Sequence, residues 1–287
     1  MEAQILLNGL LLGGVYGIAA VGLGLVWGVM SVVNVAHADL LIIFAYMTWV
    51  MVSVQTLPPF VALVLLIPVG FLLGVGMYQF VVRHLIRRTE VELMSLVLFF
   101  GISAIIYGIS AYFFGSDFRS LPIPLPTLQV AGLAVPGTRL AAFLIGGGLV
   151  LALLWFFRKT YWGKAIRAVA QSRDAARALG IDPDRVSAVS FGIALAYAGV
   201  AGALIALTSP LAPNLAVAYA GRSFAVVVLG GLGNPLGTLV AGIVLGLAES
   251  LSTFWVSFSL SPAVAFVLLF LVLIVRPQGL FKPLRSR

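Results

Sequence analysis

The chain has 287 residues, of which 62% are hydrophobic and only 9% are charged. A soluble domain carries about 25% charged residues, so this composition excludes a soluble protein and indicates one embedded in a membrane. The net charge of +8 comes from basic residues clustered at the ends of apolar segments, which membrane topology explains better than nucleic-acid binding. Cysteine is absent, so the sequence offers no disulfide framework and no indication of redox compartment.

Long apolar segments predict membrane-spanning helices, since about 20 apolar residues cross a bilayer. The alternating segments of a membrane barrel are not seen. The first span is expected at 5–33, and Glu2 replaces the basic start of a cleaved signal peptide, so we expect this segment to be retained. Leu57, Pro58 and Pro59 split the next apolar stretch, because proline cannot continue a helix. The remaining segments place spans at about 38–55, 60–82, 93–114, 140–157, 186–207 and 257–275.

The segment 222–250 decides the number of spans. Its centre, Gly230 to Pro235, reads GGLGNP, a helix-breaking sequence. Such sequence is tolerated at membrane depth where it is buried in protein or lines a cavity. A break gives nine spans and a continuous helix gives seven, and we favour the break. The sequence therefore predicts an all-α, polytopic transmembrane bundle of about seven to nine spans, with at least one broken helix, in a single domain over 1–287.

The distribution of basic residues predicts the orientation. Fourteen of the seventeen lie in three regions, with three at 83–92, seven at 158–185 and four at 276–287. Cytoplasmic loops are enriched in lysine and arginine, so these regions are expected inside, with the N-terminus outside and the C-terminus inside. The loop between 115 and 139 is then external, and its Pro122, Pro124 and Pro126 favour extended backbone.

The polar interruption at about 158–186 is the expected cytoplasmic loop. Ser172 can cap a short helix, Gly180 can end it in the left-handed conformation, and Asp182 followed by Pro183 can start the next helix. The residues alone leave two readings open: an ordinary basic loop that sets topology, or a docking surface for a soluble partner. The docking residues would be Arg173, Asp174, Ala175, Ala176, Arg177, Leu179 and Gly180.

Polar residues beside the spans form a second candidate site. Asn34, His37 and Asp39 follow the first span and either form an interfacial turn or line a translocation path, since ionisable groups at membrane depth are costly. The break can be a simple turn, or its freed backbone groups can bind a polar substrate. A metal site is disfavoured, because the sequence has two histidines and no carboxylate cluster beside them. The break residues assigned to the path are Gly231, Gly233, Asn234 and Pro235.

No motif for ATP binding or catalysis is present in the chain. The sequence lacks the G-x-x-x-x-G-K-[ST] loop that cradles phosphates, and it lacks G-x-S-x-G and H-E-x-x-H. We therefore expect no enzyme activity and assign no catalytic residue. An active transporter of this kind takes its energy from a partner, and the basic loop is where that partner is expected to bind.

Four stretches resemble one protein family. Asp174-Ala175-Ala176 and Gly180 are similar to the E-A-A-x-x-x-G core of permease subunits of bacterial ATP-binding-cassette importers, with aspartate in place of glutamate. NVAHAD from Asn34, GGLGNPLG from Gly230 and RPQGLF from Arg276 resemble N-x-A-H-G-E, G-G-x-G-[NS]-x-x-G and R-P-Q-G-L-F of the branched-chain amino acid branch. The likeness covers nearly the whole chain in the same order and is nearest to the smaller of the two permease subunits.

The resemblance implies a multi-pass permease of the bacterial inner membrane that imports branched-chain or neutral amino acids by alternating access. It implies four kinds of partner: a second permease subunit, identical or different, two cytoplasmic ATP-binding subunits, an extracytoplasmic substrate-binding protein and the lipid bilayer. It implies no cofactor and no nucleic acid. The segment 172–180 would be the coupling helix. Two alternatives remain: the same machine for urea, short amides or a sugar, and an ion-coupled carrier acting alone, with Asp39 and Glu249 as candidate ion ligands.

Overall fold

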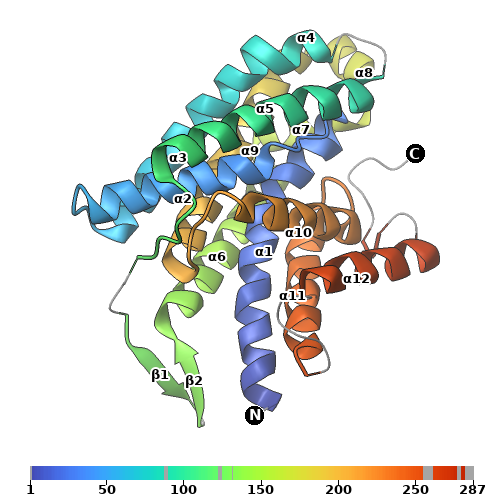
Figure 1. The fold of residues 1–287 in the computed structure, drawn as a ribbon. Coiled ribbons are helices and arrows are strands. Elements are labelled where there is room, and N and C mark those ends of the chain that lie inside the picture. Colours follow the sequence, from blue (N-terminus) through green and yellow to red (C-terminus); the bar gives the residue numbers. More distant parts are fainter. Residues whose placement is uncertain are drawn as a thin grey trace.

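The computed structural model describes residues 2–86, 90–121, 125–130, 132–254, 261–276 and 279–281. These form a helical bundle with one small hairpin (Figure 1). The π-helical segment Tyr78–Val82 joins α3 to α4. The helices are α1 (Glu2–Met30), α2 (His37–Ser53), α3 (Pro59–Met77), α4 (Arg83–Leu85), α5 (Val91–Phe114), α6 (Gly137–Lys159), α7 (Tyr161–Gln171), α8 (Arg173–Ala178), α9 (Pro183–Thr208), α10 (Leu215–Gly230), α11 (Pro235–Ser252) and α12 (Ser261–Val275).

The apolar helices match the predicted spans. Six are long and apolar enough to cross a membrane, namely α1, α3 with its π-helical extension, α5, α6, α9 and α11. Three shorter apolar helices, α2, α10 and α12, account for the other predicted segments. The turn at Leu57 to Pro59 separates α2 from α3 as expected, because Pro59 is the first residue of α3. The all-α membrane bundle is confirmed.

A short antiparallel hairpin lies between two of the helices, α5 and α6. Strands β1 (Thr127–Val130) and β2 (Leu133–Pro136) pair with Thr127 opposite Pro136. The sequence predicted extended backbone in this loop, and the two strands confirm part of that prediction. Pro122 and Pro124 lie outside the described residues. It stands at the same end of the molecule as the N-terminus, and α8 stands at the other end (Figure 1). This arrangement agrees with an external hairpin and an internal α8.

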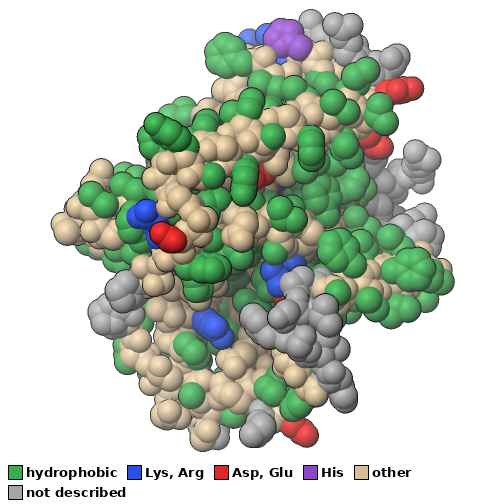
Figure 2. Space-filling view, viewed as in Figure 1, with side chains coloured by type: hydrophobic (Ala, Val, Ile, Leu, Met, Phe, Trp, Pro, Cys, Tyr) green, Lys and Arg blue, Asp and Glu red, His purple; other side chains and the backbone are tan. Residues whose placement is uncertain are grey.

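Burial divides the helices into a centre and a periphery. Over an apolar stretch of 18 residues in each helix, 89% of the stretch is buried in α1 and 78% in α9, whereas 17% is buried in α5. The face seen in Figure 2 carries mainly hydrophobic and uncharged side chains, as a surface in contact with lipid requires. The centre of the bundle is therefore built around α1 and α9, and α3, α5 and α6 supply the outer surface.

Glycines bring the central helices into close contact. A Cβ at Gly13 would lie 2.5 Å from the Ile243 Cα and 2.6 Å from the Gly242 carbonyl oxygen, across the contact between α1 and α11. A Cβ at Gly74 would lie 2.5 Å from the Phe191 carbonyl oxygen of α9. Small residues four apart allow such close backbone approach in membranes. The glycine spacing of this sequence thus serves packing within the chain.

Candidate functional site

The caps predicted for the cytoplasmic loop are present. The Ser172 Oγ accepts a hydrogen bond from the Ala175 N–H at 3.2 Å, which caps the start of α8. Gly180 has φ of 78°, in the left-handed region that ends the helix. The Asp182 Oδ1 then accepts bonds from Asp184 N–H at 2.9 Å and Arg185 N–H at 3.3 Å, which caps α9. The loop is therefore a structured joint in which α8 and α9 are held at a fixed spacing.

Arg173 faces the protein and anchors the joint. Its guanidinium donates hydrogen bonds to the Asp184 Oδ1 at 2.8 Å and to the Ser187 Oγ at 3.0 Å. Asp184 also accepts a hydrogen bond from the Tyr78 hydroxyl at 3.1 Å and lies 3.8 Å from the Arg83 Nε. Through Asp184, α8 is linked both to α9 and to the inner end of the α3–α4 segment. Arg173 thus stabilises the loop from within.

The other predicted docking residues present an outer face. The Asp174 side chain is 94% exposed and pairs with Arg177 at 3.4 Å, an exposed contact that contributes little to stability. Leu179 is 78% exposed although it is hydrophobic, and Ala175 and Gly180 are exposed beside it. Ala176 is buried and holds the opposite side of α8 against the protein. We call the exposed set Asp174, Ala175, Arg177, Leu179 and Gly180 the loop face.

The helix break lies where the sequence placed it. α10 ends at Gly230, and Gly231 and Gly233 adopt positive φ of 85° and 76°. The Asn234 Oδ1 accepts a hydrogen bond from the Gly237 N–H at 3.0 Å and so caps α11, whose first residue is Pro235. The break rests on α1, since a Cβ at Gly28 would lie 2.4 Å from the Gly233 Cα.

The C-terminal segment covers the break. The Leu280 N–H donates to the Leu229 carbonyl oxygen at 2.8 Å, and a Cβ at Gly279 would lie 2.4 Å from the Val228 carbonyl oxygen. The first contact gives a partner to the Leu229 carbonyl oxygen at the end of α10, and the second shows that the C-terminal backbone lies close against the Val228 carbonyl group. Two of the sequence motifs, at 230–237 and 276–281, are therefore in contact in the fold.

Asn34, His37 and Asp39 lie inside the bundle. Asn34 is fully buried, and neither atom of its side-chain amide has a hydrogen-bond partner among the described residues. The His37 Nε2 lies 2.8 Å from the Ala19 carbonyl oxygen of α1, and the Asp39 Oδ2 accepts a hydrogen bond from the Ser103 hydroxyl at 2.6 Å. These residues and the break both border α1, the former at Ala19 and the latter at Gly28.

A buried charge cluster joins α1, α10 and α11, and the sequence interpretation missed it. The Arg222 Nε lies 2.8 Å from the Glu249 Oε1, with the two side chains 16% and 3% exposed. The Tyr16 hydroxyl donates a hydrogen bond to the Glu249 Oε2 at 2.8 Å, and the Arg222 Cζ lies 5.1 Å from the Tyr16 ring centroid. One signal was available: Arg222 is the only basic residue between Arg185 and Arg276.

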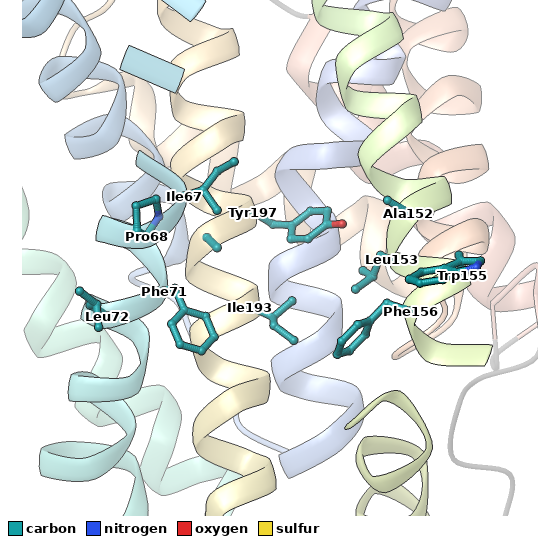
Figure 3. A pocket seen from close by; sticks show the side chains of 11 residues that line it. Ile67, Pro68, Phe71, Leu72, Ala152, Leu153, Trp155, Phe156, Ile193 and Tyr197 are labelled. Atoms are coloured by element: carbon teal, nitrogen blue, oxygen red, sulfur yellow. The ribbon is translucent and has the colours of Figure 1, made fainter. Parts of the chain in front are cut away.

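An apolar groove of about 680 Å³ lies between α3 and α6, over α9. Figure 3 shows Phe71, Ile193 and Phe156 around it, contributed by these three helices. Its polar group, the Tyr197 hydroxyl, donates to the Leu149 carbonyl oxygen at 2.6 Å. None of the residues that line the groove is charged, so the groove offers no counter-charge to a charged substrate.

Comparison with known sequences identifies the family. The sequence model described as branched-chain amino acid transport system / permease component matches residues 5–275. The chain belongs to this permease family. The residues matched include the break, the buried charge cluster, the loop face and the Asn34 region. No solved structure gives a significant match to the permease.

Individual relatives match over most of their length. The permease is 29% identical over 290 residues to the high-affinity branched-chain amino acid transport system permease protein LivH of Escherichia coli, covering 96% of this chain and 94% of that protein. It is 25% identical over 292 residues to BraD of Pseudomonas aeruginosa, with the same coverage. LivM of Escherichia coli matches at 32% over 127 residues, or 44% of the permease and 29% of LivM. The permease is thus a multi-pass inner-membrane protein of the smaller, LivH type.

Proposed function

We propose that this permease forms half of the translocation path of an ATP-driven importer for branched-chain and related neutral amino acids. Family membership supports the transport role, and the relatives named for branched-chain amino acid transport support the substrate class. The match to both LivH and LivM supports a second permease subunit of related sequence. Two cytoplasmic ATP-binding subunits and an extracytoplasmic binding protein would complete the assembly.

The loop face is the observation that carries this proposal. Leu179 is exposed beside Ala175 and Gly180, and this small apolar surface at the cytoplasmic end of a structured joint suits a groove of a soluble partner. The joint also suits mechanical coupling, because Arg173 and Asp184 tie α8 to α9, and α9 is a central helix of the bundle. Movement of the ATP-binding subunits would therefore reach α9 through α8.

The translocation path is proposed to run beside α1. Asn34, His37 and Asp39 supply its buried polar groups, and Gly231, Gly233, Asn234 and Pro235 supply a hinge where α10 and α11 meet. The unpaired amide of Asn34 supports this assignment, since a buried polar group without a partner is costly unless it has a use. The break residues form hydrogen bonds within the chain in this structure. Their proposed role is therefore to let α10 and α11 move relative to each other.

Leu179→Glu tests the docking proposal. The substitution places a charge on the exposed loop face and should leave the fold intact while it reduces co-purification of the ATP-binding subunit and leucine-stimulated ATP hydrolysis about tenfold or more. Leu128→Glu is the matched control, because Leu128 is 44% exposed on the external hairpin. Normal co-purification and normal stimulated hydrolysis with Leu179→Glu would rule out the loop face as the docking site.

A further inference from the structure

The buried charge cluster of Arg222, Glu249 and Tyr16 has no explanation in packing alone. Charged groups at membrane depth are costly and usually have a function. Tyr16 is at the midpoint of α1, and Arg222 lies well inside α10. Glu249 is in the last turn of α11, where the negative end of the helix dipole opposes a carboxylate. The glutamate is therefore not placed there to stabilise its own helix.

The cluster also has the chemistry that a zwitterion requires. Of the lysines and arginines that the structure describes, Arg222 alone lies more than one turn inside an apolar helix. A substrate carboxylate that crosses the bundle thus finds one buried positive partner among the described residues. Glu249 lies beside it and can accept hydrogen bonds from an ammonium group. The Tyr16 hydroxyl is a third polar group at the same point.

We infer that Arg222 and Glu249 recognise the two charges of the amino-acid substrate by exchanging their mutual ion pair for two ion pairs with the zwitterion. The substrate carboxylate binds the Arg222 guanidinium, and the substrate ammonium binds the Glu249 carboxylate. Tyr16 keeps Glu249 oriented through its hydrogen bond and packs its ring against the guanidinium. This inference rests on the proposed function, because it assigns residues for the substrate class named there.

Exchange explains how charge recognition and opening of the path can be linked. Separating a buried ion pair leaves two uncompensated charges, which is strongly unfavourable. A zwitterion supplies both missing partners at once, whereas a cation, an anion or a neutral molecule supplies one partner or none. Because Arg222 is on α10 and Glu249 is on α11, the exchange would release the two halves of the broken helix from each other. When Arg222 and Glu249 pair with each other, the site is closed and holds no substrate.

Binding of charge-altered analogues tests the inference. The assembled transporter without its binding protein, in lipid nanodiscs, is titrated with labelled leucine, and unlabelled leucinamide and 4-methylpentanoate are used as competitors. The first analogue lacks the carboxylate and the second lacks the ammonium. The wild type should bind leucine and should bind each analogue about tenfold or more weakly, since each loses one charged hydrogen-bonding partner.

Single substitutions should change this preference in opposite ways. Arg222→Gln should weaken the binding of leucine about tenfold or more, and leucinamide should then bind as strongly as leucine. Glu249→Gln should weaken the binding of leucine to the same extent, and 4-methylpentanoate should then bind as strongly as leucine. Arg119→Gln is the matched control, since this arginine stacks on Trp49 at 4.5 Å and belongs to neither proposed site. If both variants keep the wild-type order of preference, the inference is wrong.

The charge-reversed double variant, Arg222→Glu with Glu249→Arg, separates recognition from a purely structural clamp. Recognition predicts that the double variant regains the wild-type amount of folded protein in the membrane but binds leucine at least about tenfold more weakly. Full recovery of leucine binding would overturn the inference. Failure of the proposed function looks different, because the wild-type assembly would then neither bind nor transport any branched-chain amino acid.

Discussion

Individual polar residues inside the bundle divide into those with partners in the chain and those without. Asp39 bonds to Ser103, and Glu249 bonds to both Arg222 and Tyr16. Asn34, in contrast, is fully buried with an unpaired amide. An unsatisfied buried polar group costs about 1–3 kcal/mol, so stability does not explain why Asn34 is retained.

Asn34→Leu separates function from stability at this position. Leucine has a similarly branched shape and no polar atoms, so the melting temperature in detergent should stay the same or rise because the desolvation cost is removed. Uptake of leucine per transporter should fall about tenfold or more if the amide meets the substrate. A lower melting temperature with unchanged uptake would show that Asn34 is structural and would remove it from the path.

The sequence could identify these polar residues but not their pairing. His37, Asp39 and Glu249 stand out because ionisable groups are rare in an apolar chain, and Arg222 could have been selected by the same rule. Tyr16 and Glu249, however, are 233 positions apart in the chain. Their contact depends on how α1 and α11 cross, which local sequence patterns do not encode.

At the scale of elements, the cytoplasmic joint was the most predictable part. The caps at Ser172, Gly180 and Asp182 depend on interactions two or three residues apart, so sequence alone identifies them. Helix α7 was not separated from the loop in advance, although its buried Ile166 and Val169 follow helical spacing. The inward direction of Arg173 depends on Asp184 and Ser187 in the next helix and was not predicted.

Arg173→Ala and Arg177→Ala form a matched pair that tests the two sides of α8. Arg173→Ala removes a half-buried anchor and leaves Asp184 with one arginine fewer, so hydrogen exchange of the loop amides in 172–182 should rise markedly. Arg177→Ala breaks only an exposed pair with Asp174, worth about 0.2–1 kcal/mol, and should leave exchange unchanged. Equal exchange in the two variants would contradict the anchoring role of Arg173.

The broken helix shows a different limit of prediction. The break itself follows from the glycines and Pro235, whose backbone preferences are local. The cover over the break by Gly279 and Leu280 is a contact between distant segments, and neither motif indicates the other. One backbone group at the end of α10, the Leu229 carbonyl oxygen, accepts its hydrogen bond from the C-terminal segment, and the exposure of freed backbone groups to a substrate stays a prediction.

For the molecule as a whole, close packing of central helices is the main determinant of stability. The sequence predicted the nine apolar segments and the broken helix. It could not predict which helices would be central, because most of the nine lack a polar face that would mark one side as exposed. The glycine pattern of α1 was the available indication, since it allows close approach to α11.

Gly13→Ala and Gly148→Ala compare the closeness of packing at the centre of the bundle with that at its periphery. A Cβ at Gly13 meets backbone atoms at 2.5–2.6 Å, so the substitution should cost about 1–3 kcal/mol through overpacking. A Cβ at Gly148, within α6, meets no described atom within 4 Å, so this substitution should be neutral or should stabilise by up to about 1 kcal/mol. Thermal unfolding in detergent measures both, and equal stabilities would contradict the close packing of α1 against α11.

Transport by the reconstituted assembly tests the central claim most directly. Vesicles carry this permease with a second permease subunit, the ATP-binding subunits enclosed on one side and the binding protein supplied on the other. We predict that labelled leucine accumulates above its external concentration only when ATP is present on the side of the loop face, and that Leu179→Glu abolishes accumulation. Accumulation by the permease alone, driven by an ion gradient without ATP, would contradict the account.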